Sequence, residues 1–275
     1  MSSAVELSKS TRAATGTALS LRGVSKRFGA VQALSAIDLD VAKGEVVALV
    51  GDNGAGKSTL VKIISGVYQP DDGTMTLDGR EVVVGGPRQA QKLGIATVFQ
   101  DLALCDNLDV VANLFLGRER TAGGLLLDEV HMEQEAWRLL RRLSAKIPSV
   151  RIPIAALSGG QRQTVAIARS LVGDPGIVIL DEPTAALGVA QTAEVLSLVG
   201  RLRETGLGVI LVSHNMADVL AVADRIEVLR LGRNAARFDA ADVTTEQLVA
   251  AITGAGERSA PSTTVPSDSP AGARP

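Results

Sequence analysis

The chain has 275 residues, of which 46% are apolar, and its 28 basic and 30 acidic side chains leave a formal net charge of −2. This length suffices for one large α/β domain or two small ones with a substantial core. The near-neutral balance disfavours a protein held to nucleic acid by a general positive field. A single cysteine excludes an intramolecular disulfide. The sequence has no apolar run of the ~18 to 20 residues that span a bilayer and no secretory signal, so we expect a soluble, cytoplasmic globular protein.

Both ends of the chain are predicted to be disordered tails, over residues 1–17 and 254–275. The first is rich in Ser, Thr and Ala without periodicity, and the second is rich in Ser, Pro, Thr and Gly. Such compositions bury too little apolar surface to offset the entropy lost on ordering. One folded domain is expected between them, over residues 18–253.

The first part of that domain predicts short strands separated by tight turns. The strand candidates are residues 19–21, 36–41, 75–77 and 82–84, and the turns include Asp72-Gly73 and Asp78-Gly79. Short strands joined in this way favour an antiparallel β section near the N-terminus.

Three wholly apolar runs of strand length follow, at residues 46–50, 177–180 and 209–212. Continuous apolar runs are typical of strands buried on both faces of a parallel sheet. Residues 60–67 and 195–202 have helical apolar spacing, and strands that alternate with helices predict a parallel α/β sheet. The stretch 102–172 is predicted to be mostly helical, with Asp128 as the N-cap of one helix.

One glycine-rich segment carries the clearest chemical signal. The residues Gly51-Asp52-Asn53-Gly54-Ala55-Gly56-Lys57-Ser58 fit G-x-x-x-x-G-K-[S/T], directly after an apolar strand and at the start of a predicted helix. The glycines let backbone N–H groups wrap closely around phosphates, which the helix N-terminus also attracts. Lys57 is expected to reach the β- and γ-phosphates of a nucleotide, and the Ser58 hydroxyl to ligate Mg²⁺. The alternative is a glycine-rich turn that matches by chance, and the flanking strand and helix argue against it.

Two other apolar strands end in polar residues. Asp181 and Glu182 follow the strand at 177–180, and His214 follows the strand at 209–212. Parallel sheets bind ligands at the carboxyl ends of their strands, so these groups are expected beside the phosphate loop. Phosphoryl transfer needs a carboxylate that holds the metal and a group that orients the attacking water. Successive strand residues point in opposite directions, so one carboxylate can serve each task. A solvated pair of acids is the alternative.

A second helix N-terminus of phosphate-binding type occurs about 100 residues after the first. Leu157-Ser158-Gly159-Gly160-Gln161 precedes an amphipathic helix that runs to about Val172. Because one loop already holds the nucleotide, a simple explanation is that this second N-terminus serves another copy of the protein.

These motifs, in this order and together with Gln100, resemble the ATP-binding subunit of an ATP-binding-cassette (ABC) transporter. The resemblance covers about residues 19–250, and the pentapeptide Leu157–Gln161 makes it specific. It implies an α/β fold with a P-loop NTPase core and a mostly parallel sheet, an N-terminal antiparallel β section and an inserted helical subdomain at about 102–172. It also implies two cassettes arranged head to tail, with each ATP held between one phosphate loop and the partner's Leu157–Gln161.

The resemblance assigns a role to each motif residue. Glu182 is the general base, His214 contacts the γ-phosphate, and Gln100 senses metal and water and couples to the membrane partner. Asp181 is the metal-associated carboxylate, beside Ser58 and Gln100. Phe28 stacks on adenine, and Lys57, Ser58 and Thr59 bind phosphates and Mg²⁺. The remaining ATP contacts are Gly51, Asp52, Asn53, Gly54, Ala55 and Gly56, and, in trans, Ser158, Gly159, Gly160 and Gln161.

One position departs from the family pattern. Most members place an Asp after the residues that match Glu182–Leu187, whereas this chain has Gly188. That Asp contacts the partner's phosphate loop, so the departure bears on communication between the two ATP sites rather than on binding or basic chemistry.

Within the family, the segments 66–71, 98–104 and 107–108 are similar to the ATPases of monosaccharide importers of the ribose, xylose and fructose types. This similarity implies an ATPase that uses ATP and Mg²⁺ and drives monosaccharide uptake through a separate integral-membrane permease. A periplasmic or extracellular sugar-binding protein would act indirectly, and no nucleic acid is expected as a partner. The chain is long enough for one cassette, so it is expected to form a homodimer, peripherally bound at the cytoplasmic face of the cell membrane.

Three other interpretations stay open from the sequence. The chain could be the ABC ATPase of another importer or of an exporter, because the sugar rests on similarity. It could be a non-transport ABC ATPase acting on ribosomes or DNA, although such proteins usually fuse two cassettes or carry long coiled coils. A solitary P-loop protein would leave Leu157–Gln161 unexplained.

Overall fold

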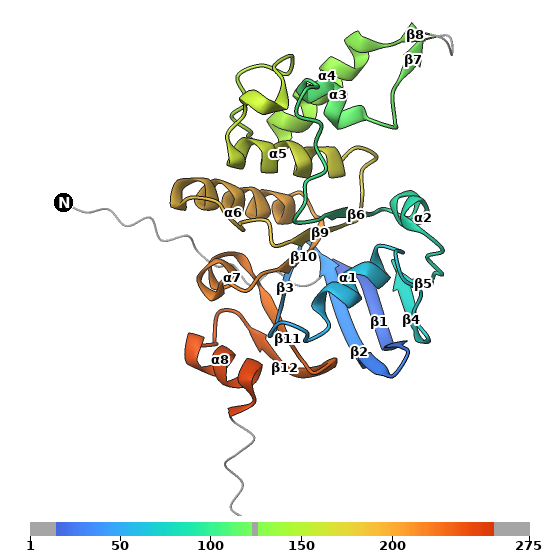
Figure 1. The fold of residues 1–275 in the computed structure, drawn as a ribbon, viewed down its shortest axis with the longest axis vertical. Helices are drawn as coiled ribbons and strands as arrows, with labels where there is room; N and C mark the ends of the chain where they lie inside the picture. Colours follow the sequence, from blue (N-terminus) through green and yellow to red (C-terminus); the bar gives the residue numbers. More distant parts are fainter. Residues whose placement is uncertain (1–14, 123–125, 256–275) are drawn as a thin grey trace, which may run out of the picture.

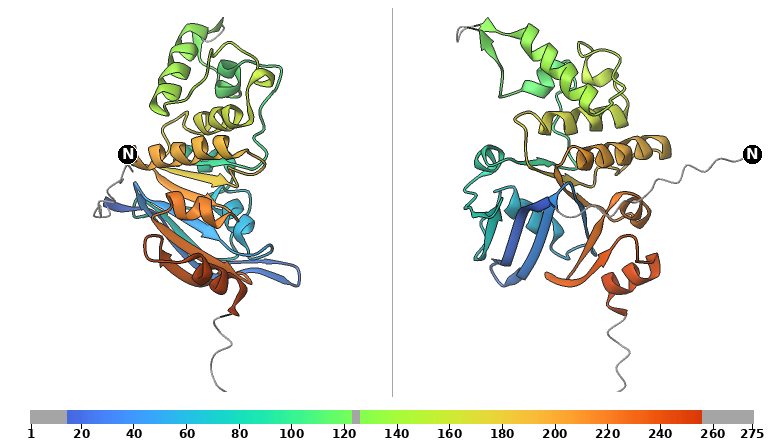
Figure 2. Two further views of the ribbon diagram at one scale, coloured as in Figure 1. Left: turned by 90° about the vertical axis from the view of Figure 1, so that its left-hand side faces the viewer. Right: turned by 180° about the vertical axis from the view of Figure 1, so that it is seen from behind.

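The computed structural model describes residues 15–122 and 126–255, and they form two large sheets, a two-stranded hairpin and a helical subdomain. The helical subdomain stands at one end of the molecule, and the two sheets occupy the rest (Figure 1). Views from the side and from behind show the same arrangement (Figure 2). The predicted fold class is confirmed by this architecture.

A six-stranded sheet forms the centre of the molecule. In spatial order its strands are β12 (Arg233–Asp239), β11 (Arg225–Arg230), β3 (Val46–Val50), β10 (Gly208–Val212), β9 (Ile177–Asp181) and β6 (Ile95–Val98). All neighbours pair in parallel except β11 and β12. The carboxyl ends of β3, β10, β9 and β6 therefore lie side by side along one edge.

The central strands are apolar because both of their faces are covered. Every residue of β3 and β10 is buried. Val46 and Val50 pack in one hydrophobic cluster, whereas Val47 and Leu49 pack in the other, as the alternation of a strand requires. The predicted strand at 46–50 matches β3, and those at 177–180 and 209–212 match β9 and β10 to within one residue.

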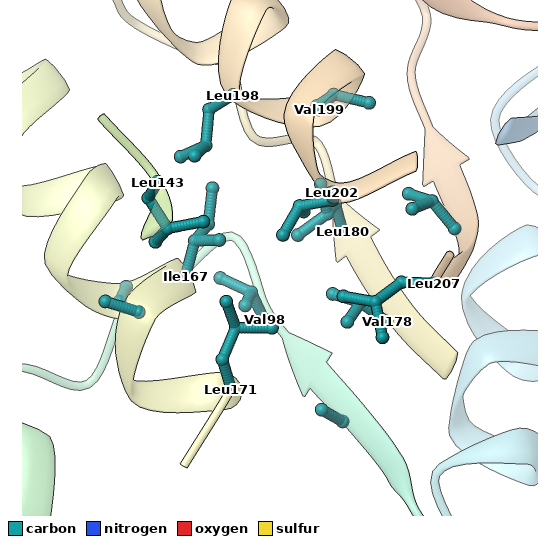
Figure 3. Close-up of a cluster of buried hydrophobic side chains, with 14 of the residues drawn as sticks. Val98, Leu143, Ile167, Leu171, Val178, Leu180, Leu198, Val199, Leu202 and Leu207 are labelled. Carbon is teal, nitrogen blue, oxygen red and sulfur yellow. The ribbon is translucent and has the colours of Figure 1, made fainter. Parts of the chain in front are cut away.

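Helices cover the sheet. Figure 3 shows α6 and α5 packed over β9 and β6, with Leu202 beside Leu180, Leu198 turned toward Ile167, and Ile167 near Val98. The helices that accompany the sheet are α1 (Lys57–Ile64), α2 (Pro87–Lys92), α6 (Val189–Glu204), α7 (Met216–Val222) and α8 (Thr245–Thr253).

The predicted antiparallel section is a four-stranded sheet in the order β2 (Val31–Lys43), β1 (Thr15–Phe28), β4 (Asp72–Leu77) and β5 (Arg80–Glu81). Two details of the prediction are wrong. β1 begins at Thr15, inside the segment predicted as a tail, and the rest of that tail lies outside the described residues. Residues 82–84 form no strand. Instead, the Val83 carbonyl accepts a hydrogen bond from the Gln89 side chain at 2.9 Å, and the Val84 carbonyl accepts one from the Gln69 side chain at 2.6 Å.

The predicted helical subdomain contains α3 (Val110–Phe115), α4 (Glu129–Arg142), a 3-10 turn (Ile154–Ala156) and α5 (Gly159–Ser170). Asp128 caps α4 as predicted and accepts a hydrogen bond from the His131 N–H at 3.0 Å. An unpredicted hairpin, β7 (Thr121–Ala122) with β8 (Leu126–Leu127), projects from this subdomain.

No helix in the described part of the chain is both long enough and apolar enough to span a bilayer.

Candidate functional site

The phosphate loop follows β3 without interruption and leads into α1. Gly56 is the N-cap of α1 at φ +105°, a backbone conformation that favours glycine. A Cβ at this position would lie 2.9 Å from the backbone oxygen of Ala33, so a side chain also lacks room. No side chain caps α1 and no acid stands in its first turn, which leaves its N–H groups open to an anion.

Lys57 lies inside this loop rather than on its surface. Its ammonium donates to the carbonyls of Gly51 at 2.6 Å and Asp52 at 3.0 Å. An ammonium has three protons, so one donor remains for a phosphate oxygen. Burial lowers the pKa of Lys57, and the nearby carboxylates of Glu182, Asp52 and Asp181 oppose that shift.

Asp181 is the last residue of β9, the second strand from β3, and Glu182 follows it directly. Burial raises the pKa of Asp181, and the charge of Glu182 raises it further, while Lys57 and Lys62 oppose the rise. The pair is therefore a site where added positive charge, such as a divalent cation, is favourable.

His214 lies beside Glu182 as the strand order requires, because β10 is the neighbour of β9. The His214 Nδ1 atom is 3.1 Å from Glu182 Oε1. Glu182 itself has φ +50°, an uncommon conformation for a residue with a side chain. Its backbone N–H donates to the Val212 carbonyl at 2.9 Å, which ties the two strand ends together.

Gln100 follows β6, the fourth strand end along the same edge, and is exposed. The exposed Ser58 belongs to the first turn of α1. The structure thus brings the phosphate loop, His214, the acidic pair and Gln100 to one edge in the order of β3, β10, β9 and β6. A cavity of about 270 Å³ lies at the starts of the strands instead, beside Ile177 and Leu207, and no predicted site residue lines it.

Ser158–Gln161 also belong to the predicted site but stand apart from this edge. They begin α5 in the helical subdomain, where Ser158 accepts from the Gln161 N–H at 3.3 Å and the Gln161 side chain accepts from the Ser158 N–H at 3.0 Å. This capping box fixes the first turn of α5. Ser158 and Gly159 are exposed, which agrees with the prediction that they serve another copy.

Phe28 ends β1 and is 41% exposed, as a residue that stacks on a base needs to be. Its ring lies edge-on to Tyr68, with 5.1 Å between ring centroids. The end of β1 next to Phe28 is further held by Asp71, which accepts hydrogen bonds from Lys26 Nζ and from the Arg27 N–H, both at 2.7 Å. Sequence reasoning missed this support, although Tyr68 is one of only six aromatic residues in the chain.

A family model described as ABC transporter matches residues 34–185. The chain belongs to the ABC transporter family. It is an ATPase cassette of that family, as the phosphate loop and the acidic strand end already indicate.

Curated relatives support this membership over most of the chain. The xylose/arabinose import ATP-binding protein XylG of Sulfolobus acidocaldarius is 46% identical over 215 residues, which cover 78% of this chain and 85% of that protein. The fructose import ATP-binding protein FrcA of Rhizobium meliloti is 44% identical over 246 residues, covering 87% and 95%.

Solved structures have the same fold. The ADP conformation of MJ1267, an ATP-binding cassette of an ABC transporter, matches with a TM-score of 0.75 at 25% identity, covering 87% of this chain and 96% of that one. The dimeric structure of MJ0796, a bacterial ABC transporter cassette, matches with a TM-score of 0.68 at 27% identity, covering 81% and 98%.

Proposed function

We propose that this ATPase powers a monosaccharide importer, by coupling ATP binding and hydrolysis to uptake through a separate permease. The observation that carries the hydrolytic part is the contact between Glu182 and His214 at the sheet edge that also carries Lys57. The sugar class rests on the identity of 46% and 44% to proteins named for xylose/arabinose and fructose import.

The chain's own groups divide the work of hydrolysis. The open N–H groups of α1 and the free donor of Lys57 bind the phosphates, and Thr59 adds a hydroxyl in the first turn. Glu182 accepts the proton of the attacking water. His214, held 3.1 Å from Glu182, faces the γ-phosphate. Phe28 stacks on adenine against the edge of Tyr68.

Mg²⁺ fits the groups present here. Ser58, Gln100 and Asp181 offer oxygen ligands, the kind that Mg²⁺ prefers. No cluster of three or more His, Cys, Asp or Glu side chains suited to a metal occurs among residues 15–122 and 126–255. That matches a cation bound largely by substrate phosphates and water rather than by a protein cage. When bound, the ion neutralises charge on the phosphates.

The partners follow from the incomplete site. Ser158–Gln161 are on a different subdomain from the phosphate loop, so two copies arranged head to tail would complete two ATP sites. The dimeric form of the related cassette MJ0796 supports this arrangement. A permease in the membrane, a sugar-binding protein outside it and a peripheral position at the cytoplasmic face complete the proposal.

The test is Glu182→Gln. The amide keeps the size of the side chain but does not accept the proton of water at neutral pH, so turnover should fall ~10²- to 10⁴-fold. ATP affinity should be kept or increased, because a negative charge near the γ-phosphate is removed. With hydrolysis blocked, Mg-ATP should also shift the protein from monomer to dimer in sedimentation.

The control is Glu194→Gln on the exposed face of α6, which should hydrolyse ATP at the parental rate. Parental turnover in Glu182→Gln would contradict Glu182 as the base. An inactive variant that stays monomeric with Mg-ATP would contradict the dimer. For the substrate class, cells lacking this chain should lose uptake of one labelled monosaccharide among xylose, arabinose, fructose and ribose, and normal uptake of all four would contradict it.

A further inference from the structure

α7 contains a buried carboxylate that the proposed chemistry does not use, and it contacts the segment that follows Glu182. Asp218 in α7 is 6% exposed. One of its oxygens accepts a hydrogen bond from the Thr184 hydroxyl at 2.7 Å. Burying a charged carboxylate is costly unless it is hydrogen-bonded, and such charge-assisted bonds are short and strong.

Thr184 belongs to a loop whose backbone is strained. In the segment 182–188, which joins β9 to α6, Glu182 has φ +50° and Ala186 has φ +59°. Neither is a glycine, so both conformations persist only where surrounding contacts hold them. Strain of this kind gathers at functional sites, and the Thr184 hydroxyl bond is one of the contacts that hold it.

Asp218 lies close to His214 along the chain. Asn215 caps α7 by accepting from the Ala217 N–H at 3.0 Å, so the chain enters the helix directly after His214. Asp218 follows His214 by four residues and lies in the first turn of α7. The loop 182–188 is therefore attached to the 214–218 segment at two points, Glu182 to His214 and Thr184 to Asp218.

We propose that Thr184 and Asp218 are positioning residues that hold Glu182 in register with His214 for the attack of water. This inference rests on the proposed function, in which Glu182 is the base. The carboxylate of Asp218 touches neither substrate nor reacting atoms. Its role is to fix the loop so that the base and the histidine approach the same phosphate from neighbouring strands.

The sharpest test replaces one hydroxyl by a methyl group. Thr184→Val keeps the branched shape of the side chain but cannot donate to Asp218, so kcat for ATP should fall about 10- to 100-fold, as small misplacements of reacting groups cause. The Kd for ATP, measured without hydrolysis, should stay within about twofold, because the phosphate loop is untouched. Thr184→Ser retains the donor and should recover most of the loss.

Thr192→Val is the matched control, because it makes the same change in the first turns of α6 and should leave kcat unaltered. A Thr184→Val protein that hydrolyses ATP at the parental rate would overturn the proposal. So would equal losses of kcat and of ATP affinity, because those indicate general damage to the fold.

Epistasis separates this inference from the function on which it rests. If Thr184 acts through the base, adding Thr184→Val to Glu182→Gln should cost almost nothing further. Parental turnover in Glu182→Gln alone would defeat the proposed function. A strong Glu182→Gln effect that multiplies with an independent Thr184→Val effect would defeat only the positioning role.

A second pair of variants decides the matter if Thr184→Val folds poorly. Asp218→Asn keeps an oxygen that accepts from Thr184, whereas Asp218→Leu keeps a similar size without an acceptor. We expect Asn to retain most of the parental kcat and Leu to lose about 10- to 100-fold at unchanged ATP affinity. Equal activity of the two variants, with circular dichroism showing both folded, would overturn the proposal.

Discussion

Two helices of this chain begin where a phosphate is expected, and their N-termini are completed in opposite ways. α1 starts from Gly56 with no side-chain cap, whereas α5 starts from Ser158 with a closed capping box. α1 emerges from the fully buried strand β3 at the centre of the molecule. α5 begins in the helical subdomain, at residues Ser158 and Gly159 that are exposed. One N-terminus is left open, and the other is closed by its own side chains.

The difference shows how each N-terminus can contribute to one ATP site. At α1 the unpaired N–H groups need an anion to satisfy them, so this N-terminus is suited to hold the phosphates on its own. At α5 the Ser158 oxygen accepts from the Gln161 N–H, which uses a lone pair but not the hydroxyl proton. Ser158 therefore still has one hydrogen bond to donate, enough to complete a site that another loop has formed.

The first prediction concerns a side chain added at Gly56, the N-cap of α1. Gly56→Ala adds a Cβ that would lie 2.9 Å from the Ala33 backbone oxygen, at a φ of +105°. The clash and the backbone strain together should reduce ATP affinity more than about 100-fold. Calorimetric titration measures the loss. Gly79→Ala, at φ +75° with nothing within 4 Å, carries the strain alone and should bind ATP normally.

The second change removes the cation from the open N-terminus. Lys57→Ala deletes a charge-assisted contact worth ~1.5 to 3 kcal/mol, so ATP affinity should fall about 10- to 150-fold. Lys92→Ala, in the exposed last turn of α2, is the control and should bind ATP as the parent does. If calorimetry gives the two variants the same affinity for ATP, the assignment of nucleotide binding to this loop is contradicted.

The central strands of the fold could be predicted because a strand that is buried on both faces consists of apolar residues. β3, β9 and β10 are covered on both faces, so their residues are uniformly apolar and their limits are visible. The start of β1 at Thr15 could not be seen, because its first residues have no apolar alternation. The apolar residues 82–84 gave the opposite error, because the carbonyls of Val83 and Val84 accept hydrogen bonds from the side chains of Gln89 and Gln69.

The candidate site likewise contains residues whose position the sequence predicts and a contact that it does not predict. Its phosphate loop, acids and histidine each follow a strand directly, and a parallel sheet brings such positions to one edge. The bond between Thr184 and Asp218 could not be predicted, because it joins residues 34 apart through a loop with left-handed Glu182. A contact of that kind depends on the local path of the chain, which neither periodicity nor motif spacing specifies.

A third experiment asks whether the two N-termini act in one site from different copies. Ser158→Arg blocks the α5 contribution, and Lys57→Ala damages the α1 contribution. A heterodimer of the two contains one site damaged twice and one intact site. Mixing two inactive proteins in equal amounts should therefore restore up to about a quarter of the parental ATPase activity. If mixing restores no ATPase activity under conditions that favour dimers, the two N-termini do not form one site from different copies.

The smallest expected effect separates the two tasks of Ser158, capping its helix and donating to phosphate. Ser158→Ala removes the cap and should destabilise the fold by about 1 kcal/mol, a shift of about 2 to 4 °C in Tm. Ser158→Asp restores a strong cap, so its Tm should match the parent, but its negative charge at the phosphate should reduce ATPase activity further than Ala does. Thermal unfolding and phosphate release measured on both variants give opposite rank orders if the two tasks are distinct. The same rank order in both assays would mean that Ser158 acts on ATP hydrolysis only by holding α5 together.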